Sequence, residues 1–154
     1  MPKKILFVCT GNTCRSPMAE GFLKKLAQEN SLPLDIDSAG LAAFAGVPPT
    51  SEAVQACRER GIDISGHLSQ PLSKALVLGS DLILTMTVRH KEMIVKKMPE
   101  LEPKVALFSE FAGAGLEDVE DPVGQPLEVY RQVLGQMEGY LQKAMDRWRN
   151  FSAT

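Results

Sequence analysis

The sequence has few cysteines, little net charge and no long apolar run near its start, and each shortage excludes a class of protein. Three cysteines in 154 residues, an odd number, cannot build the disulfide framework of a small secreted domain. A formal charge of −2 excludes the broad basic surface that binds nucleic acids. The apolar run from Ile5 to Val8 is too short for a signal segment or a membrane span. We therefore expect no nucleic-acid or membrane partner, and we expect a soluble protein in the reducing cytoplasm.

The sequence does have enough apolar residues for a core. Hydrophobic residues make up 44% of the chain and charged residues 23%, which is typical of globular proteins. No repeat and no linker divides the chain. Because this length is usual for one structural unit, we expect residues 1–154 to form a single domain.

Short apolar segments alternate with helical patterns along the chain. Continuous apolar runs are typical of strands buried on both faces, whereas Asp35 and Asp37 alternate with apolar residues and predict a strand at the sheet edge. The alternation predicts an α/β fold, a doubly wound four-stranded parallel sheet with helices on both faces. The expected strands are 3–8, 34–38, 81–86 and 104–108, and the expected helices are 17–30, 50–60, 72–78, 88–98 and one long helix from 127 to 148.

The loop after the first strand has the composition of an anion site. In doubly wound sheets, ligands bind beyond the carboxyl ends of the strands. Here that loop reads Cys9-Thr10-Gly11-Asn12-Thr13-Cys14-Arg15-Ser16, with five residues between the first cysteine and the arginine. A short turn from a strand into a helix directs backbone N–H groups inward, which suits a phosphate group. We therefore expect all the residues from Thr10 to Ser16 to surround a bound phosphate.

Cys9 and Arg15 are the reactive residues that this loop predicts. The amide dipoles that hold a phosphate also favour an ionised Cys9 thiolate, which is a nucleophile. Arg15 can donate two parallel hydrogen bonds to phosphate oxygens. Gly11 gives the backbone conformational freedom and Asn12 tolerates a positive φ, while Ser16 can cap the helix and donate to the thiolate.

With these residues in place, the stretch from Val8 to Pro17 resembles the signature of the low-molecular-weight protein tyrosine phosphatase family. The resemblance covers nearly the whole chain, because Ser38-Ala39-Gly40, Gly66-His67-Leu68-Ser69 and Asp121-Pro122 follow in the family's order. It implies a cysteinyl-phosphate formed on Cys9, no cofactor or metal, phosphorylated proteins as partners, and a monomer or weak dimer.

The resemblance also implies roles for residues outside the loop. Asp121 is implied as the general acid, and Ser38 and His67 as residues that support the loop together with Asn12 and Ser16. The residues themselves agree on Asp121, because the following Pro122 favours an extended backbone that leaves the carboxyl group free. The acidic run 117–121 is expected to attract a cationic leaving group.

Two positions bear on the substrate. Thr13 resembles the protein-arginine phosphatase branch of the family, whereas tyrosine-specific members carry an aliphatic residue there. Val123 replaces the aromatic residue that follows the Asp-Pro pair in both branches, so that a phenyl ring loses a stacking contribution of about 0.5–1.5 kcal/mol. We expect phosphoarginine as the substrate, with phosphotyrosine as the alternative.

The remaining cysteines and histidines have simpler interpretations. Cys14 is either core filling or the partner of Cys9 in a reversible disulfide, and Cys57 is expected to be structural. His90 is expected on a solvated helix face with its neighbours. Zinc binding by Cys9, Cys14, His67 and His90 fits no usual spacing.

Other classes of function are less well supported. A dinucleotide loop at Gly113 lacks its third glycine. A thioredoxin-coupled arsenate reductase needs further cysteines near the third strand, and residues 82–87 contain none. A phosphate-binding module without activity predicts loss of Cys9, Arg15 or Asp121, all of which are present.

Overall fold

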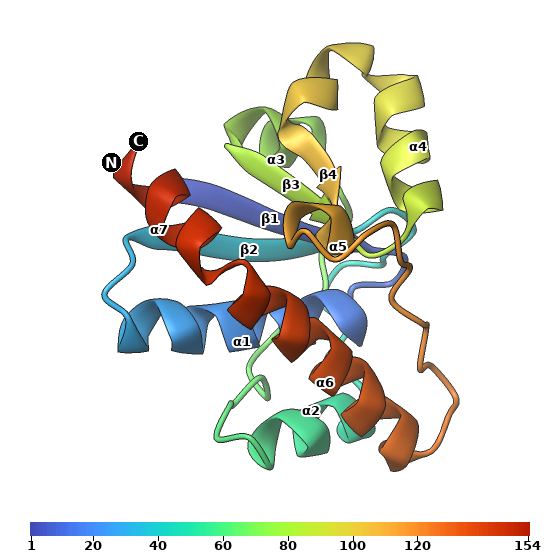
Figure 1. Ribbon diagram of the computed structural model, residues 1–154. Helices are drawn as coiled ribbons and strands as arrows, with labels where there is room; N and C mark the ends of the chain where they lie inside the picture. Colours follow the sequence, from blue (N-terminus) through green and yellow to red (C-terminus); the bar gives the residue numbers. More distant parts are fainter.

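The computed structural model describes residues 1–154, and its centre is a four-stranded parallel sheet (Figure 1). The strand order is β2-β1-β3-β4, which confirms the predicted fold class. β1 (Lys3–Cys9) lies between β2 (Leu34–Gly40) and β3 (Leu82–Thr85), and β4 (Val105–Leu107) forms the second edge. The strand with alternating polar and apolar residues is β2, and it lies at an edge of the sheet as predicted, because its first residues are buried on only one face.

Helices cover both faces of the sheet (Figure 1). Two apolar clusters of strand and helix side chains fill the space between the helices and the sheet. The larger cluster joins Phe7 of β1 to the helices on one face, and the smaller one joins Val8 to α3 and α4 on the other. The helices are α1 (Arg15–Glu29), α2 (Ser51–Arg58), α3 (Lys74–Gly79), α4 (Val88–Lys97), α5 (Phe108–Phe111), α6 (Leu127–Lys143), α7 (Met145–Ala153) and the 3-10 helix η1 (Pro99–Lys104).

Threonine side chains cap the N-termini of two of the helices. Thr50 accepts from the amide of Ala53 at the start of α2, and Thr87 accepts from the amide of His90 at the start of α4. The prediction for α1 is wrong. Its N-cap is Cys14, which makes no side-chain capping hydrogen bond, and Ser16 lies inside the helix because its hydroxyl bonds to the preceding loop.

The predicted single C-terminal helix is interrupted at Ala144, where α6 ends and α7 begins. The indole Nε1 of Trp148 donates to the Leu141 carbonyl at 3.2 Å. In a continuous helix that carbonyl would accept from the Met145 amide, so the buried indole competes with the helical ladder at the bend. No helix of the protein is both long enough and apolar enough to cross a bilayer.

Candidate active site

The loop between β1 and α1 surrounds a small cavity. All residues from Cys9 to Arg15 line it, together with Asp121 and Val123 from the segment before α6, and its volume is about 170 Å³. The cavity lies at the carboxyl end of β1, where the sheet topology predicts a ligand site. The structure thus brings the predicted nucleophile, arginine and acid together.

Cys9 lies at the bottom of this cavity, at the end of β1, and is 2% exposed. The amide of Asn12 donates to its Sγ at 3.2 Å, and the Ser16 hydroxyl lies 2.8 Å from the same sulfur. The N-terminus of α1 begins six residues later, so its partial positive charge is close to the sulfur. The amide, the hydroxyl and the helix N-terminus thus surround the Cys9 sulfur with hydrogen-bond partners and partial positive charge.

Arg15 joins the loop to the segment that carries the predicted acid. Its guanidinium is buried and donates to the carbonyl of Val119 at 3.0 Å. The second guanidinium nitrogen lies 3.6 Å from a carboxylate oxygen of Asp121. The other Asp121 oxygen accepts from the amide of Val123 at 3.1 Å, and the side chain is half-exposed. The carboxyl group of Asp121 is therefore held at the mouth of the cavity, within reach of an entering ligand.

Asn12 is the structural centre of the loop. It is fully buried with φ of 57°, and its side-chain amide donates to the hydroxyls of Ser16 at 2.8 Å and Ser38 at 2.9 Å. His67 Nε2 lies 2.9 Å from the Asn12 carbonyl, and Asn12 Oδ1 accepts from the amide of Gln70. The structure thus brings together all four residues of the expected supporting network.

Gly11 does not have the role that the sequence suggests. The left-handed conformation of the loop is at Asn12, whereas Gly11 has no positive φ, and a Cβ there would make only an ordinary contact. Gly40 at the end of β2 is the glycine that the loop needs. A Cβ at Gly40 would lie 2.5 Å from the Thr10 carbonyl oxygen and 3.0 Å from the Asn12 amide nitrogen. The backbone of β2 approaches the backbone of the loop so closely that a residue with a Cβ does not fit at this position.

Glu20 belongs to the supporting network, and sequence reasoning missed it. It lies on α1, one turn after Ser16, where it accepts from the Ser38 hydroxyl and lies 3.9 Å from His67 Nδ1. The spacing of four residues from Ser16 was the available signal, because positions i and i+4 share one helix face.

His90 is not on a solvated face, so that prediction is wrong. Its side chain is buried, and its Nε2 lies 2.9 Å from the Thr10 hydroxyl oxygen. Arg89 on one side is exposed and Lys91 on the other is half-buried, as expected of surface residues. The His90 side chain therefore points from α4 toward the loop, while its two neighbours face the surface. Because the contact joins residues 80 positions apart, the local sequence carries no signal of it.

Cys14 is buried, with its sulfur next to the start of α2 and a residue of α6. Its Sγ lies 3.4 Å from the hydroxyl of Tyr130 and 3.6 Å from that of Thr50. Burial raises the pKa of Tyr130 to about 12, so this hydroxyl keeps its proton at neutral pH and can donate it. Cys57 is fully buried on α2, where burial raises the pKa of its thiol to about 12, which confirms the structural interpretation. All three cysteines are free thiols.

The acidic run does not act as a unit at the cavity. Glu117 accepts from the Tyr140 hydroxyl at 2.7 Å, and Asp118 accepts from the amide of Val88 at 2.9 Å. These two carboxylates anchor the segment to α6 and α4, while Val119 is buried. Of the five residues 117–121, only Asp121 lines the cavity.

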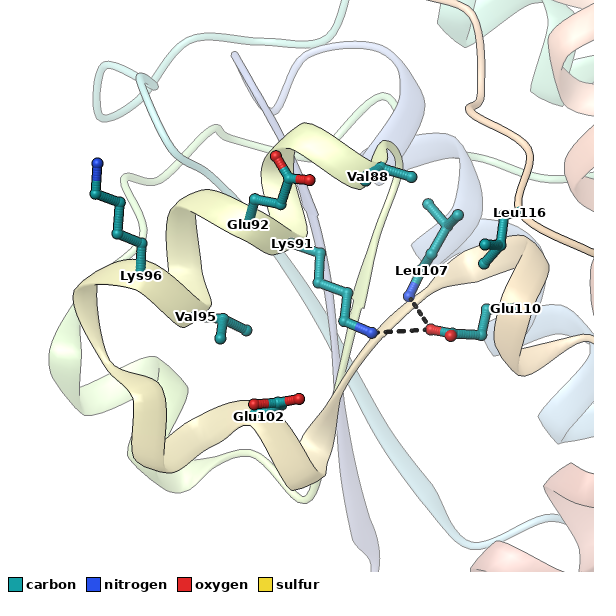
Figure 2. Close-up of a pocket in the computed structure, with 9 residues that line it drawn as sticks. All are labelled: Val88, Lys91, Glu92, Val95, Lys96, Glu102, Leu107, Glu110 and Leu116. Atoms are coloured by element: carbon teal, nitrogen blue, oxygen red, sulfur yellow. Dashed lines mark hydrogen bonds and ion pairs between the residues drawn. The ribbon is translucent and has the colours of Figure 1, made fainter.

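A larger pocket lies apart from this chemistry. It measures about 520 Å³ and lies between α4, η1 and the β4–α5 turn, where an ion pair between Lys91 and Glu110 crosses it (Figure 2). The nine residues drawn there include no cysteine or histidine (Figure 2). No group of three or more His, Cys, Asp or Glu side chains in the structure is arranged to hold a metal ion.

The fold and the cavity define an α/β protein in which a strand-to-helix loop surrounds a small cavity with a cysteine at its base and a buried arginine beside it. The family model described as low molecular weight phosphotyrosine protein phosphatase matches residues 4–150. A protein-arginine-phosphatase of Bacillus subtilis is 38% identical over 139 residues, which are 90% of this chain and 92% of the relative. The low molecular weight protein-tyrosine-phosphatase Wzb of Escherichia coli K12 is 33% identical over 96% of this chain and 94% of its own.

Solved structures agree with this result. The YwlE arginine phosphatase, solved as a cysteine-to-serine mutant with a phosphorylated active-site serine, superimposes with a TM-score of 0.91 at 36% identity, over 95% of each chain. The chain therefore belongs to the low-molecular-weight phosphotyrosine protein phosphatase family, and it is a protein phosphatase.

Proposed function

We propose that this protein hydrolyses phosphoarginine in proteins through a cysteinyl-phosphate intermediate on Cys9. The observation that carries the proposal is the position of the Cys9 sulfur, which accepts from the Asn12 amide and lies next to the Ser16 hydroxyl inside the phosphate-sized cavity. Arg15 and Asp121 lie at the same cavity, 3.6 Å apart. The phosphorylated active-site serine of the related YwlE mutant supports a covalent phosphoenzyme.

In the first step the Cys9 thiolate attacks phosphorus. The S–P bond forms as the P–N bond breaks, and the electron pair of the broken bond goes to the guanidine nitrogen, which takes a proton from Asp121. Arg15 and the backbone N–H groups of the loop stabilise the charge that develops on the phosphoryl oxygens. The hydrogen bonds to Sγ keep the thiolate in position for the attack.

In the second step a water molecule attacks the phosphocysteine. The O–P bond forms, the S–P bond breaks, and Cys9 leaves as a thiolate while Asp121 accepts the proton of the water. Inorganic phosphate is released. Because Arg15 and the loop amides supply the positive charge, we expect turnover to persist in the presence of a metal chelator.

Two features favour phosphoarginine over phosphotyrosine. Thr13 lines the cavity where tyrosine-specific relatives carry an aliphatic residue, and Val123 offers no ring to stack on a phenyl group. The carboxylate of Asp121 at the mouth can also accept a hydrogen bond from a guanidinium group. Two relatives that are 38% and 37% identical are named protein-arginine-phosphatase.

One observation favours phosphotyrosine as the second candidate. Phe44 is 81% exposed on the loop after β2, and the neighbouring Ala42 amide donates to the Thr10 carbonyl. An exposed ring two residues after a backbone contact with the phosphate loop is a candidate for stacking on a phenol. The two candidates therefore differ in which leaving group the mouth of the cavity accepts.

The test is a comparison of kcat/KM on two peptides of one sequence, phosphorylated on arginine in one and on tyrosine in the other. We expect faster turnover of the arginine peptide and a phosphorylated protein that can be isolated after acid quench. Cys9→Ser, measured on the same peptides, is the control for contaminating phosphatases. Faster turnover of the tyrosine peptide would support the second candidate, and activity of Cys9→Ser equal to wild type would contradict the mechanism.

We also propose that residues 1–154 form a single domain that works in the cytoplasm as a monomer or weak dimer. All the residues of the cavity come from one chain, and a thiolate nucleophile needs a reducing compartment. Size-exclusion chromatography with light scattering at assay concentration tests the monomer.

Cys14 is proposed as the redox partner of Cys9, because both thiols are free and belong to one short loop. We expect peroxide to inactivate the wild type reversibly, with recovery after a dithiol is added. Cys14→Ser should lose activity irreversibly under the same treatment. Equal recovery in both proteins would contradict this role.

A further inference from the structure

His90 is the residue of α4 that reaches the phosphate loop. It is the third residue of the helix, its backbone amide donates to the Thr87 hydroxyl, and its side chain is 6% exposed. The 2.9 Å contact between its Nε2 and Thr10 Oγ1 is the one hydrogen bond that joins α4 to the loop. Thr10 directly follows Cys9 and lines the cavity. Which of the two groups donates in this hydrogen bond therefore affects what Thr10 can offer to an anion in the cavity.

The second ring nitrogen of His90 indicates which tautomer is present. Nδ1 is enclosed by protein and has no hydrogen-bond partner. A proton on Nδ1 would be a buried N–H donor without an acceptor, which native proteins almost never contain, whereas a bare Nδ1 leaves only an unused lone pair. The environment thus favours the proton on Nε2, from where it is donated to the Thr10 oxygen.

The tautomer determines what Thr10 offers to the cavity. If Nε2 carries the proton, Thr10 Oγ1 accepts it, and the hydroxyl proton of Thr10 remains free because no other protein atom bonds to that oxygen. If Nδ1 carries the proton, Thr10 must donate to Nε2, and only its lone pairs remain. A free proton attracts an anion, whereas free lone pairs repel it.

We propose that His90 is a positioning residue, which donates from Nε2 and thereby fixes the Thr10 hydroxyl as a hydrogen-bond donor to the anion in the cavity. The proposal rests on the phosphatase function proposed above and adds to it a residue from outside the loop. It also explains a polar side chain on the buried face of α4, where an apolar residue would fill the space without leaving Nδ1 unpaired.

The charges around His90 agree with a neutral ring. Burial and, to a smaller extent, the positive charges of Arg15 and Arg89 lower the pKa of His90 to about 4, against the opposite effect of Asp118 and Asp121. At neutral pH the imidazole is therefore uncharged, and it keeps one nitrogen protonated and one bare. A neutral ring can hold the donor orientation of Thr10 without adding a second cation beside Arg15.

The first test reads the tautomer in the wild-type protein. The ¹⁵N chemical shifts of the histidine ring nitrogens distinguish a protonated from a bare nitrogen, and the chain contains only two histidines. The signals that disappear in His90→Gln assign the ring. We expect a protonated Nε2 and a bare Nδ1 at pH 7. A protonated Nδ1 would overturn the proposal without any assay of activity.

The second test measures binding of inorganic phosphate by NMR titration in single and double variants. Thr10→Val and His90→Leu are each expected to weaken binding by about tenfold, because a hydrogen bond to a charged group is lost. Together they should weaken it no further, since both remove the same donor. His90→Gln places an amide N–H at the position of Nε2 and is expected to bind within about twofold of wild type.

Met93→Ala, one turn later on α4 and half-exposed, is the matched control for substitution in this helix and should bind phosphate as the wild type does. Additive losses in the double variant, or wild-type binding by His90→Leu, would overturn the proposal. If the proteins bind phosphate as expected but do not turn over phosphopeptides, the proposed function fails while the role of His90 holds. If turnover is normal and the double-variant pattern is absent, only the role of His90 fails.

Discussion

Thr13 is a residue of the phosphate loop whose side chain we expect to affect specificity rather than the hydrolysis itself. The loop amides and Arg15 can bind a phosphoryl group whichever side chain stands at position 13, because the groups that bind it come from the backbone and from the arginine. The hydroxyl of Thr13 lies at the cavity beside Cys14. We therefore expect this side chain to act on the choice of leaving group.

Replacement of Thr13 by isoleucine is therefore expected to change specificity. Thr13→Ile should lower the ratio of phosphoarginine to phosphotyrosine turnover by about tenfold, because a polar wall becomes apolar. The measurement is kcat/KM on the two peptides of one sequence. Thr13→Ser keeps the hydroxyl and serves as the control, with a ratio near that of wild type. Equal ratios in Thr13→Ile and wild type would contradict the assignment of this position to specificity.

Asp121 is expected to matter most when the leaving group is poor. Asp121→Asn cannot donate a proton, and general acid catalysis contributes typically 10²–10⁴-fold. We expect a loss of about that size on phosphopeptides and a much smaller loss on p-nitrophenyl phosphate, whose leaving group needs little protonation. Glu120→Gln, which changes the adjacent exposed carboxylate, is the matched control and should stay within about twofold of wild type.

At the scale of elements, the backbone at the end of β2 packs closely against the phosphate loop. Gly40→Ala places a Cβ against the Thr10 carbonyl and the Asn12 amide, so the loop or the strand must move. We expect a loss of about 1–3 kcal/mol in the free energy of unfolding and a large fall in kcat/KM.

The matched control for this change is Gly135→Ala on α6, where an added Cβ meets no neighbouring atom. This variant should gain about 0.5–1 kcal/mol in urea unfolding because alanine favours the helix, and its activity should not change. A Gly40→Ala protein as stable and active as wild type would show that the loop does not depend on this close approach.

Local patterns predicted most of the elements. The apolar runs of β1 and β3 and the alternating residues of β2 act within a few residues, so that the sequence carries their signal directly. The short helices α5 and η1 were missed because they have only four and six residues, too few for a periodic pattern.

The candidate site likewise contains residues that local spacing predicts and residues that only distant contacts define. The residues of the loop were predictable because their spacing is local, and the residues that support it from afar were found only through a family resemblance. His90, Glu20 and Gly40 were not assigned roles, since their contacts join segments that lie far apart along the chain. The bend at Ala144 escaped prediction because it depends on where the Trp148 indole finds its acceptor.

At the scale of the whole molecule, the buried His90 makes stability depend on pH. Its pKa is about 4 in the folded protein against 6.5 for an ordinary histidine. Between these values the unfolded chain binds a proton that the folded protein does not, so the free energy of unfolding falls as the pH falls. Below about pH 4 both states are protonated and this contribution stops changing.

Urea unfolding of the wild type and of His90→Gln at pH 7 and pH 5 checks this expectation. The wild type should lose more stability than the variant over that interval, because glutamine has no proton to bind, while the carboxylates contribute to both proteins. Equal losses would show that His90 does not titrate in this way.

The two apolar clusters share the strands of one sheet, and this predicts a single unfolding transition. Residues of β1 and β3 contribute to both clusters, Phe7 to one and Val8 to the other. We expect far-ultraviolet circular dichroism and near-ultraviolet circular dichroism to give the same urea midpoint. Separate midpoints would indicate that residues 1–154 contain two cooperative units.

Trp148 is the single tryptophan of the chain, and it is fully buried on α7, in contact with the ring of Phe111 at a centroid distance of 4.6 Å. Neither ring belongs to the residues that line the catalytic cavity. Its fluorescence therefore reports how the C-terminal helix is seated on the sheet, and ligands can be added to the cavity without entering the environment of the fluorophore. Optical signals of folding and chemical signals of turnover can thus be followed independently in one cuvette.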